Sequence, residues 1–406
     1  MQLGPAMSLV ILSTHPIQYQ APVYRYIQSE LGIPVAVIYG SDFSITGYRD
    51  REFGVDLSWD SDLLSGYTSI FLSSSERGGA TSAETVSARG IGRALRRLRS
   101  DAILLTGYRP RFDWGAFLAA RQTGCPLLLR AETTDHAVRR GPLKRLARDT
   151  FLRGFYCRFS RLLYIGKRSR EHYLRLGARE EQLIFSPYCV DLSAFQVEES
   201  DRERHRARTR QALNLTDEQI VLLFSGKLVS GKGPDLLLEA VKGLSHPLRK
   251  QLAVLFLGEG QLRPSLQTLA ESTPEVAVRF AGFQNQRSLS QFYHAADMLV
   301  LPSFSETWGL VVNEALHHGL PCVVSTAVGS ALDLVHEGIT GATFEVASTL
   351  DLARAILRTI DLLRLPELRS RCQQHAQSYG LDVAARGIAR AYREAVVSSG
   401  GDGVVC

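Results

Sequence analysis

Short runs of consecutive apolar residues recur along the whole chain, and each run is bounded by turn-forming residues. Such runs are typical of parallel strands that are buried on both faces. In the first half we expect strands at Leu9–Ser13, Val35–Tyr39, Ala102–Thr106, Leu127–Arg130 and Leu162–Ile165. In the second half we expect them at Ile220–Ser225, Ala253–Leu257, Val278–Phe280, Met298–Leu301 and Pro321–Val324.

Patterns with helical spacing separate these strands, for example at Pro234–Lys242, Leu289–Ala295 and Leu310–His318. Strands that alternate with helices predict an α/β fold with doubly wound parallel sheets. Ten strands are too many for one ordinary core, so we expect two Rossmann-like domains, connected near Ser186–Glu199. In such sheets ligands bind beyond the carboxyl ends of the strands, so the candidate site residues should lie on loops that follow strands.

Composition narrows the class of protein. The chain has 406 residues, of which 45% are apolar and 22% charged, and this balance excludes disordered and collagen-like proteins. Its longest apolar run, Leu252–Leu257, is too short to span a membrane, and its first residues do not read as a signal peptide. The six cysteines contain no Cys-x-x-Cys pair, which argues against a zinc site and favours a reducing, cytoplasmic compartment.

Positive charge is concentrated in residues 136–161, which carry eight Lys or Arg residues against a single Asp. This stretch also predicts a helix with an apolar stripe, from the spacing of Leu143, Leu146, Ala147, Phe151 and Phe155. A basic helix at 139–158 can lie on an anionic membrane surface, which would make the protein peripheral on the cytoplasmic face. Alternatively, its apolar side covers a core. No nucleic-acid-reading motif accompanies the charge, so nucleic acid is not an expected partner.

A glycine-rich loop with two lysines follows the strand expected at Ile220–Ser225. Residues 226–232 match the phosphate-binding pattern Gly-x-x-x-x-Gly-Lys, but Gly233 stands where a metal-binding hydroxyl is required. Metal-dependent ATP hydrolysis is therefore disfavoured. Lys227 and Lys232 on such a loop instead suit a diphosphate held without a metal. Taken alone, the loop could also be a solvated Gly-Lys turn.

Two glutamates eight positions apart flank the start of the helix expected at Leu310–His318. The helix begins near Gly309, so the backbone N–H groups of Gly309, Leu310 and Val311 are suited to a phosphate. Glu314, inside the helix, can accept hydrogen bonds from both vicinal hydroxyls of a ribose. Glu306, ahead of the helix, can accept from hydroxyls of the group attached to the far phosphate.

With these motifs the chain resembles the retaining GT-B glycosyltransferases of family 4. The resemblance runs from about Ser186 to Val346 and is carried by Ser225–Leu238, Phe256–Gly260, Phe280–Gly282, Ala296–Glu314, Gly319–Thr326, Gly329 and Gly338–Gly341. It implies two Rossmann-like domains that face each other across a cleft, and a C-terminal helix that crosses back to the first domain. We accordingly expect an acceptor-side domain at 1–187, a nucleotide-sugar-binding domain at 188–382, the crossing helix at 383–396 and a flexible tail at 397–406.

The resemblance also implies roles for single residues. Lys227 and Lys232 would bind the donor diphosphate, Glu314 the ribose and Glu306 the transferred sugar. Backbone groups of Gly309 to Val311 would contact the phosphate and the sugar, and Phe283 would lie near the base. No metal or cofactor is implied beyond a nucleoside diphosphate sugar as donor substrate.

The first half resembles a narrower branch of the same family, through Thr14–Pro22, Phe53–Val55 and Trp59–Tyr67. His15, Gln18 and Gln20 stand where most members have a glycine-rich loop. They are candidates for donor or acceptor contacts, or else a loop cluster that satisfies itself. Many members carry a catalytic His that touches the donor sugar after the fourth strand. Here His136 or Glu132 is the candidate for that role.

These features predict a metal-independent, retaining glycosyltransferase. It would move a sugar to a hydroxyl of a glycan or lipid-linked acceptor, in the synthesis of cell-surface polysaccharide or glycolipid. A catalytically silent nucleotide-sugar-binding partner protein with the same fold is the alternative. Asp60-Ser61-Asp62 matches the Asp-x-Asp of metal-dependent GT-A transferases but follows no convincing strand. A dehydrogenase is disfavoured because no Gly-x-Gly-x-x-Gly follows the first strand.

Overall fold

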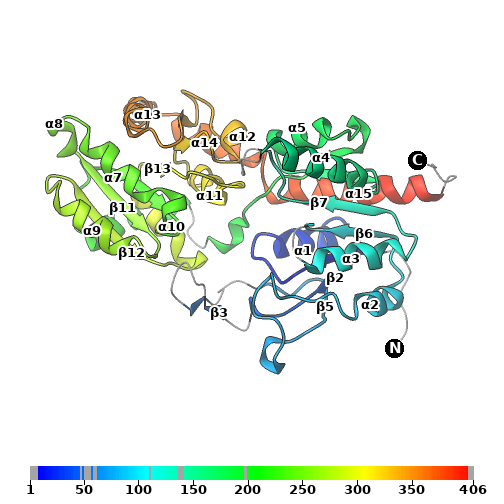
Figure 1. Ribbon diagram of the computed structural model, residues 1–406. Coiled ribbons are helices and arrows are strands. Elements are labelled where there is room, and N and C mark those ends of the chain that lie inside the picture. The colour runs from blue at the N-terminus through cyan, green and yellow to red at the C-terminus, as the bar shows by residue number, and fades with distance from the viewer. Residues whose placement is uncertain are drawn as a thin grey trace. The chain divides into compact units, whose positions relative to one another are not determined.

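The computed structural model describes residues 8–45, 48–49, 56–57, 62–108, 111–135, 141–195 and 199–400. They form two compact units, each built on one parallel β-sheet with helices packed against it (Figure 1). The main passage from the first unit to the second lies between Cys189 and Val190, and the chain returns to the first unit at Gly380. Arg49, Asp56 and Leu57 also group with the second unit.

The sheet of the first unit has seven strands in the order β5-β2-β1-β6-β7-β8-β9. Five of them match strands expected from the sequence, whereas β5 and β9 were not expected, because β5 is a partly exposed edge strand and β9 is only three residues long. The strands are β1 (Leu9–Ser13), β2 (Val35–Tyr39), β5 (Thr68–Phe71), β6 (Ala102–Leu105), β7 (Leu127–Arg130), β8 (Arg161–Tyr164) and β9 (Leu183–Phe185). Outside this sheet, two two-residue strands, β3 (Tyr48–Arg49) and β4 (Asp56–Leu57), pair with each other, and β4 groups with the second unit.

Helices bury both faces of this sheet. Val10 and Leu12 of β1 share one core with side chains of α2, α3 and α4. Helices α1 and α15 pack against each other, and α15 also packs against β8 and β9. The helices are α1 (Ala21–Ser29), α2 (Ile91–Leu98), α3 (Arg111–Arg121), α4 (Pro142–Tyr156), α5 (Lys167–Arg175) and α15 (Leu381–Gly400).

The C-terminal helix α15 packs closely on the first unit. Ser186 Oγ donates a hydrogen bond of 2.9 Å to the carbonyl oxygen of Ala384. A Cβ atom on Gly387 would lie only 2.1 Å from the carbonyl oxygen of Phe185, so this crossing requires glycine. The helix is longer at both ends than the expected 383–396, and residues 397–400, which we expected in the tail, continue it.

The sheet of the second unit has six strands in the order β12-β11-β10-β13-β14-β15. Its strands are β10 (Ile220–Ser225), β11 (Leu252–Leu257), β12 (Ala277–Gly282), β13 (Met298–Leu301), β14 (Cys322–Ser325) and β15 (Gly341–Phe344). Its helices are α6 (Arg202–Ala212), α7 (Pro234–Lys242), α8 (His246–Arg249), α9 (Arg263–Glu271), α10 (Gln286–Ala295), α11 (Leu310–His317), α12 (Ala331–Leu334), α13 (Thr349–Leu362) and α14 (Leu368–Gln377). Of these strands, only β15 was not expected from the sequence.

Both sheets reverse their strand order at the centre. In the first unit the reversal lies between β1 and β6, and in the second between β10 and β13. At such a switch point the loops that follow the two neighbouring strands leave in opposite directions and open a crevice for a ligand. The fold therefore places the loops after β1 and β6, and those after β10 and β13, at the expected sites.

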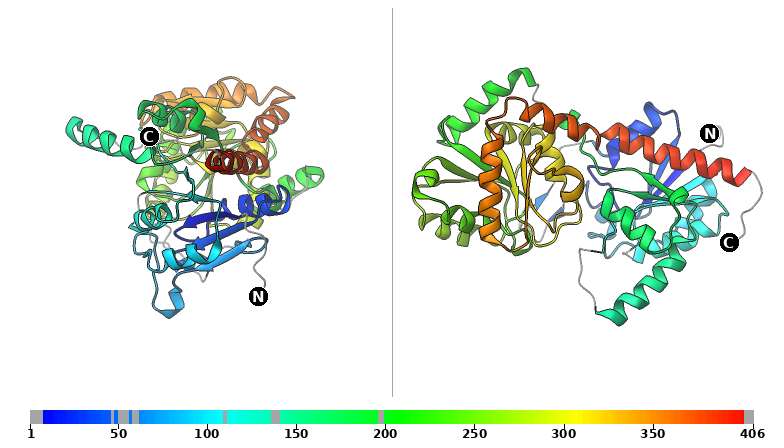
Figure 2. Two further views of the ribbon diagram at one scale, coloured as in Figure 1. Left: turned by 90° about the vertical axis from the view of Figure 1, so that its right-hand side faces the viewer. Right: turned by 90° about the horizontal axis from the view of Figure 1, so that it is seen from above.

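Helix α4, which lies in the basic stretch, projects from the body of the first unit in both views of Figure 2. Its apolar residues do not form the single stripe expected from their spacing. Phe155 is buried in the core, whereas Leu143, Leu146 and Phe151 are 82%, 66% and 53% exposed. Covering a core therefore does not account for these three side chains. Within the described residues, no helix combines the length and the apolar character that crossing a membrane requires.

Replacing Gly387 by Ala should destabilise the first unit, because the added methyl group must displace either α15 or β9. Overpacking of this kind costs about 1–3 kcal/mol, which thermal unfolding would detect. Gly154→Ala in α4 is the matched control, since a Cβ atom there meets nothing within 4 Å. That substitution should leave stability unchanged or raise it by up to about 1 kcal/mol. Equal unfolding temperatures for both variants would contradict the packing described for α15.

Candidate functional site

In the second unit, the loops that follow β10 and β13 are joined by an ion pair. Lys232 Nζ donates to the carboxylate of Glu306, although 74 positions separate the two residues in sequence. The backbone N–H of Phe304 also donates to the carbonyl oxygen of Gly231 at 3.0 Å. Gly233 has a φ of +62°, and a Cβ atom there would lie 2.6 Å from the carbonyl oxygen of Pro302. The two loops therefore form one closely packed structure.

Lys227 lies earlier on the same loop, at the carboxyl end of β10. The residues on either side of it, Gly226 and Leu228, donate backbone hydrogen bonds of 2.9 and 2.8 Å to the carbonyl oxygens of Leu257 and Glu259. These bonds attach the loop to the segment that follows β11. The backbone of Lys227 is thereby fixed on both sides, while its side chain is half-buried.

The start of α11 lies directly beyond Glu306. Gly309 is the N-cap residue and provides no side chain to cap the first N–H groups of the helix, which include those of Leu310 and Val311. The loop ahead of the helix is held by a backbone hydrogen bond of 2.9 Å from Gly329 to Glu306. The positive end of the α11 dipole and the Lys232 ammonium group thus accompany Glu306 at this strand edge, an arrangement suited to an anion.

Glu314 is buried inside α11, with 8% of its surface exposed. Burial raises the pKa of its carboxyl group to about 7, although a hydrogen bond from Tyr293 acts in the opposite direction. Tyr293 Oη donates this bond to Glu314 Oε2 at 2.6 Å. Burial and the neighbouring carboxylate raise the pKa of Tyr293 well above its usual value, so this hydroxyl stays a donor. No sequence signal had identified Tyr293.

The buried His318 contacts both Glu314 and Tyr293. His318 lies with Nδ1 2.7 Å from the carbonyl oxygen of Glu314 and with Nε2 2.9 Å from Ser290 Oγ. Its ring also stacks on Tyr293, with 4.8 Å between the ring centroids. Because Ser290 and Tyr293 belong to α10, His318 fixes α10 against α11 and sets the position of the Glu314 carboxylate.

Phe283 lies on the loop that directly follows β12, an edge strand of the second sheet, and it is half-buried. The loop is held by a hydrogen bond of 2.8 Å from Gln284 Nε2 to the carbonyl oxygen of Ala281. The structure thus brings together Lys232, Glu306 and the start of α11. It places Phe283 after a different strand of the same sheet.

The first unit contains a pocket of about 180 Å³ at the carboxyl ends of β1, β6 and β7. It includes two residues expected from the sequence, Gln20 and Glu132, together with tyrosines and an aspartate that were not. The lining residues are Thr14, Ile17, Tyr19, Gln20, Thr106, Gly107, Tyr108, Asp113, Ala131, Glu132 and Tyr188. This pocket lies at the switch point of the first sheet, where the fold predicts a ligand.

Glu132 is held by an aromatic residue of the motif that follows β1. Tyr19 Oη donates a hydrogen bond of 3.0 Å to Glu132 Oε1. The Tyr19 ring lies 5.0 Å from that of Tyr188, and the guanidinium group of Arg130 covers the Tyr188 ring at 4.9 Å. The carboxylate of Glu132 therefore has a defined position in the pocket wall.

The other residues of this motif are engaged locally. The His15 ring lies 4.6 Å from that of Phe43, and burial lowers the pKa of His15 to about 4, so its imidazole is neutral near pH 7. Gln20 precedes α1 and accepts a hydrogen bond of 2.8 Å from Tyr24 Oη. Gln18 has a buried Oε1 atom without a hydrogen-bond partner among the described residues. Of the three, only Gln20 lines the pocket.

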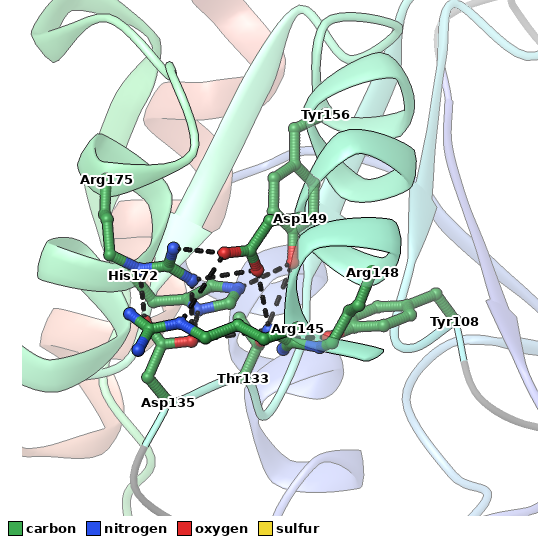
Figure 3. Close-up of polar contacts among 9 residues, drawn as sticks. All are labelled: Tyr108, Thr133, Asp135, Arg145, Arg148, Asp149, Tyr156, His172 and Arg175. Carbon is green, nitrogen blue, oxygen red and sulfur yellow. Dashed lines mark hydrogen bonds and ion pairs between the residues drawn. The ribbon is translucent and has the colours of Figure 1, made fainter. Parts of the chain in front are cut away.

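A network of charged and hydroxyl groups lies beside the pocket (Figure 3). Asp135 accepts hydrogen bonds from Arg175, Arg148 and His172 Nδ1. Burial alone raises the pKa of Asp135, but hydrogen bonds from His172 and Arg175 outweigh it and hold that pKa well below its usual range. The nine residues drawn are Tyr108, Thr133, Asp135, Arg145, Arg148, Asp149, Tyr156, His172 and Arg175.

Some candidates from the sequence lie outside the described residues. They are His136, the Phe53–Val55 segment, and the Asp60 and Ser61 residues of the Asp-x-Asp sequence. Asp62, the last residue of that sequence, accepts hydrogen bonds from the backbone N–H groups of Leu64 and Ser65. This is the turn-capping role that such a residue commonly has.

Comparisons with known proteins agree with these observations. The family described as Glycosyl transferases group 1 matches residues 205–379, and the Glycosyl transferase 4-like domain matches residues 68–189. A D-inositol 3-phosphate glycosyltransferase 1 of Catenulispora acidiphila is 35% identical over 230 residues, which cover 54% of this chain and 53% of that protein. A D-inositol 3-phosphate glycosyltransferase of Streptomyces griseus is 36% identical over 47% of this chain and 42% of its own. The chain thus spans about half the length of the curated relatives it matches.

Two solved structures share the fold over nearly the whole chain. Anabaena Alr3699/HepE in complex with UDP and glucose superposes with a TM-score of 0.66 at 18% identity, over 95% of this chain and 98% of that one. WaaG, a glycosyltransferase involved in lipopolysaccharide biosynthesis, has a TM-score of 0.62 at 18% identity, over 97% and 100% of the two chains. A glycosyltransferase family thus matches part of each half of the chain, and the chain shares the two-sheet GT-B fold of these structures.

Proposed function

We propose that this protein is a retaining, metal-independent glycosyltransferase that moves a sugar from a nucleoside diphosphate sugar to a hydroxyl of a glycan or lipid-linked acceptor. The observation that carries the proposal is the joined pair of loops at the β10/β13 switch point. Lys232, Glu306 and the start of α11 lie together there, with the buried Glu314 carboxylate inside the same helix. The relatives named above are glycosyltransferases, which supports transfer over a purely binding role.

In this proposal Lys227, Lys232 and the start of α11 bind the diphosphate. Glu314 accepts hydrogen bonds from the ribose hydroxyls, Glu306 from the transferred sugar, and Phe283 lies near the base. The fold neighbour crystallised with UDP and glucose supports uracil as the base and a hexose as the sugar. Glu306 is paired with Lys232 in the structure, so the diphosphate would compete with Glu306 for the ammonium group.

For the chemical step, the acceptor oxygen forms a bond to the anomeric carbon while the bond from that carbon to the diphosphate oxygen breaks. The acceptor proton passes to the departing phosphate. Lys227, Lys232 and the helix dipole stabilise the charge that develops on this leaving group. Glu306 is held by Lys232 and Glu314 by Tyr293, so we propose same-face attack rather than a carboxylate nucleophile.

The exposed apolar residues of α4 support a membrane surface as partner. Leu143 and Leu146 are largely exposed, Phe151 is half-exposed beside Trp114, and Lys144 and Arg145 are exposed near them. Basic and apolar side chains on one projecting helix suit the headgroup region of an anionic bilayer. We propose that the protein is peripheral on the cytoplasmic face of the membrane. WaaG, which is involved in lipopolysaccharide biosynthesis, supports a role in cell-surface polysaccharide or glycolipid synthesis.

A catalytically silent partner protein would keep the fold and bind nucleotide without transfer. Slow hydrolysis of nucleoside diphosphate sugars in the absence of an acceptor separates the two functions. We expect one donor of a panel that includes UDP-glucose to be hydrolysed. If none is hydrolysed although nucleotide binds, the silent function is favoured.

Glu306→Ala and Glu314→Ala should have different effects. Removing Glu306 leaves Lys232 without its counter-charge, so UDP should bind as tightly as before or more tightly, while the transfer or hydrolysis rate falls. Loss of hydrogen bonds to a charged group corresponds to about 1.5–3 kcal/mol, a reduction of roughly 10- to 100-fold. Glu314→Ala should instead weaken UDP binding, which calorimetry measures. Parental turnover by Glu306→Ala would show that its assigned role is wrong.

Nucleotide binding should weaken as the pH falls through about 7, where the Glu314 carboxyl group takes up a proton. A protonated carboxyl group accepts hydrogen bonds from the ribose hydroxyls less well than a carboxylate does. Tyr293→Phe removes a hydrogen bond that favours the ionised form, so the loss of affinity should begin at higher pH. UDP-glucose is the suitable probe, because its diphosphate does not titrate near neutrality. Glu314→Gln is the control and should abolish the pH dependence; identical profiles for all three proteins would contradict the assignment.

Binding to vesicles that contain phosphatidylglycerol should fall steeply when NaCl is raised from about 0.05 M to 0.5 M, because salt screens the Lys and Arg charges. Leu143→Glu combined with Leu146→Glu should reduce co-sedimentation with the vesicles. Leu118→Glu is a matched control, since Leu118 is 59% exposed on α3 of the same unit. Salt-independent binding, or an equal loss in the control, would refute the proposed surface.

A further inference from the structure

The pocket of the first unit carries two carboxylates and, among its described lining residues, no Lys or Arg. Asp113 lies in the first turn of α3 and is 6% exposed. Glu132 follows β7 and accepts the Tyr19 hydroxyl. The remaining polar groups in the lining are the neutral side chains of Thr14, Gln20, Thr106 and the three tyrosines. The described lining is therefore negatively charged and rich in hydrogen-bonding groups.

The buried guanidinium group beside this pocket is engaged elsewhere. Arg130 Nε donates to the carbonyl oxygen of Ser186 at 3.1 Å, and its terminal nitrogen donates to that of Pro187 at 2.5 Å. The same group lies over the Tyr188 ring. Arg130 thus fixes the segment that carries Tyr188, and an anionic ligand would have to compete with two backbone carbonyl groups for it.

The residues that follow Glu132 in the chain belong to the network shown in Figure 3. Thr133, the next residue, has its hydroxyl 2.8 Å from Tyr108 Oη and 3.5 Å from Tyr156 Oη. Asp135, two residues further, is bound by arginines of α4 and α5. Tyr108 is itself a lining residue. The segment after Glu132 is therefore held in place, and Tyr19 holds the carboxylate itself.

We infer that this pocket selects an uncharged, polyhydroxylated acceptor and discriminates against a phosphorylated one. The inference rests on the proposed transferase function and specifies the acceptor. Sugar hydroxyls can donate to Glu132 and Asp113, whereas a phosphate monoester has acceptor oxygens in place of donors and carries the same sign of charge as both carboxylates. Like charges brought together in this way exclude a competing ligand, which is how specificity is commonly built.

The test compares matched pairs of ligands that differ by one phosphate: glucose with glucose 6-phosphate, mannose with mannose 6-phosphate, and myo-inositol with myo-inositol 3-phosphate. Binding to the full chain, saturated with UDP, is measured by calorimetry or ligand-observed NMR. We expect at least one uncharged member to bind ten-fold or more tightly than its monophosphate. The inference is wrong if every monophosphate binds as tightly as its uncharged partner or more tightly. It is also wrong if none of the uncharged members binds.

Variants distinguish this pocket from other surfaces. Glu132→Gln keeps an acceptor for Tyr19 but removes the charge, so the preference for the uncharged member should fall at least three-fold. Glu181→Gln, at an exposed position of the same unit, is the control and should leave the preference unchanged. Circular dichroism and thermal unfolding report that each variant is folded. An unchanged preference in Glu132→Gln overturns the inference, whereas donor hydrolysis without acceptor tests the proposed function separately.

Discussion

The ion pair between Lys232 and Glu306 joins the two loops on which the second unit depends for its chemistry. Parallel pairing of β10 with β13 brings their carboxyl ends to one edge of the sheet, so residues far apart in sequence become neighbours. The charges are only partly exposed, at 28% and 17% of their side-chain surfaces, so water screens their attraction less than on an open surface. Such a pair keeps both groups in place and leaves each able to exchange its partner for a charged ligand.

Glu314 illustrates a different use of burial. An ionised carboxylate inside a helix is unfavourable unless hydrogen bonds compensate the lost hydration. The structure provides one such bond from Tyr293 and fixes the tyrosine through the His318 ring. The raised pKa of Glu314 shows that compensation is incomplete. A ligand with two vicinal hydroxyls would supply further hydrogen-bond donors to the Glu314 carboxylate. Ligand binding would therefore add the hydrogen bonds that the carboxylate lacks in the free protein.

Helix α4 has two distinct faces in the first unit. Its inner side supplies Phe155 to the core, and Arg148 and Asp149 to the network of Figure 3, which holds the loop beside the pocket. Its outer side presents Leu143, Leu146 and basic residues to solvent. One helix therefore carries both the exposed apolar side chains and residues of the network beside the pocket. The two faces cannot be distinguished from hydropathy, since leucine and phenylalanine occur on both.

The sequence by itself determined the two parallel sheets, because strands buried on both faces leave continuous apolar runs, and it determined the Lys and Glu motifs after β10 and β13. It could not reveal β5, which is partly exposed, β9, which has only three residues, or β15, in which Gly341 and Thr343 interrupt the apolar pattern. Only the tertiary structure decided that Tyr293 supports Glu314 and that Tyr19 supports Glu132, since 21 and 113 positions separate these partners. Hydrogen bonds between distant segments leave no local periodicity, and their partners become neighbours only when the sheets align the ends of their strands.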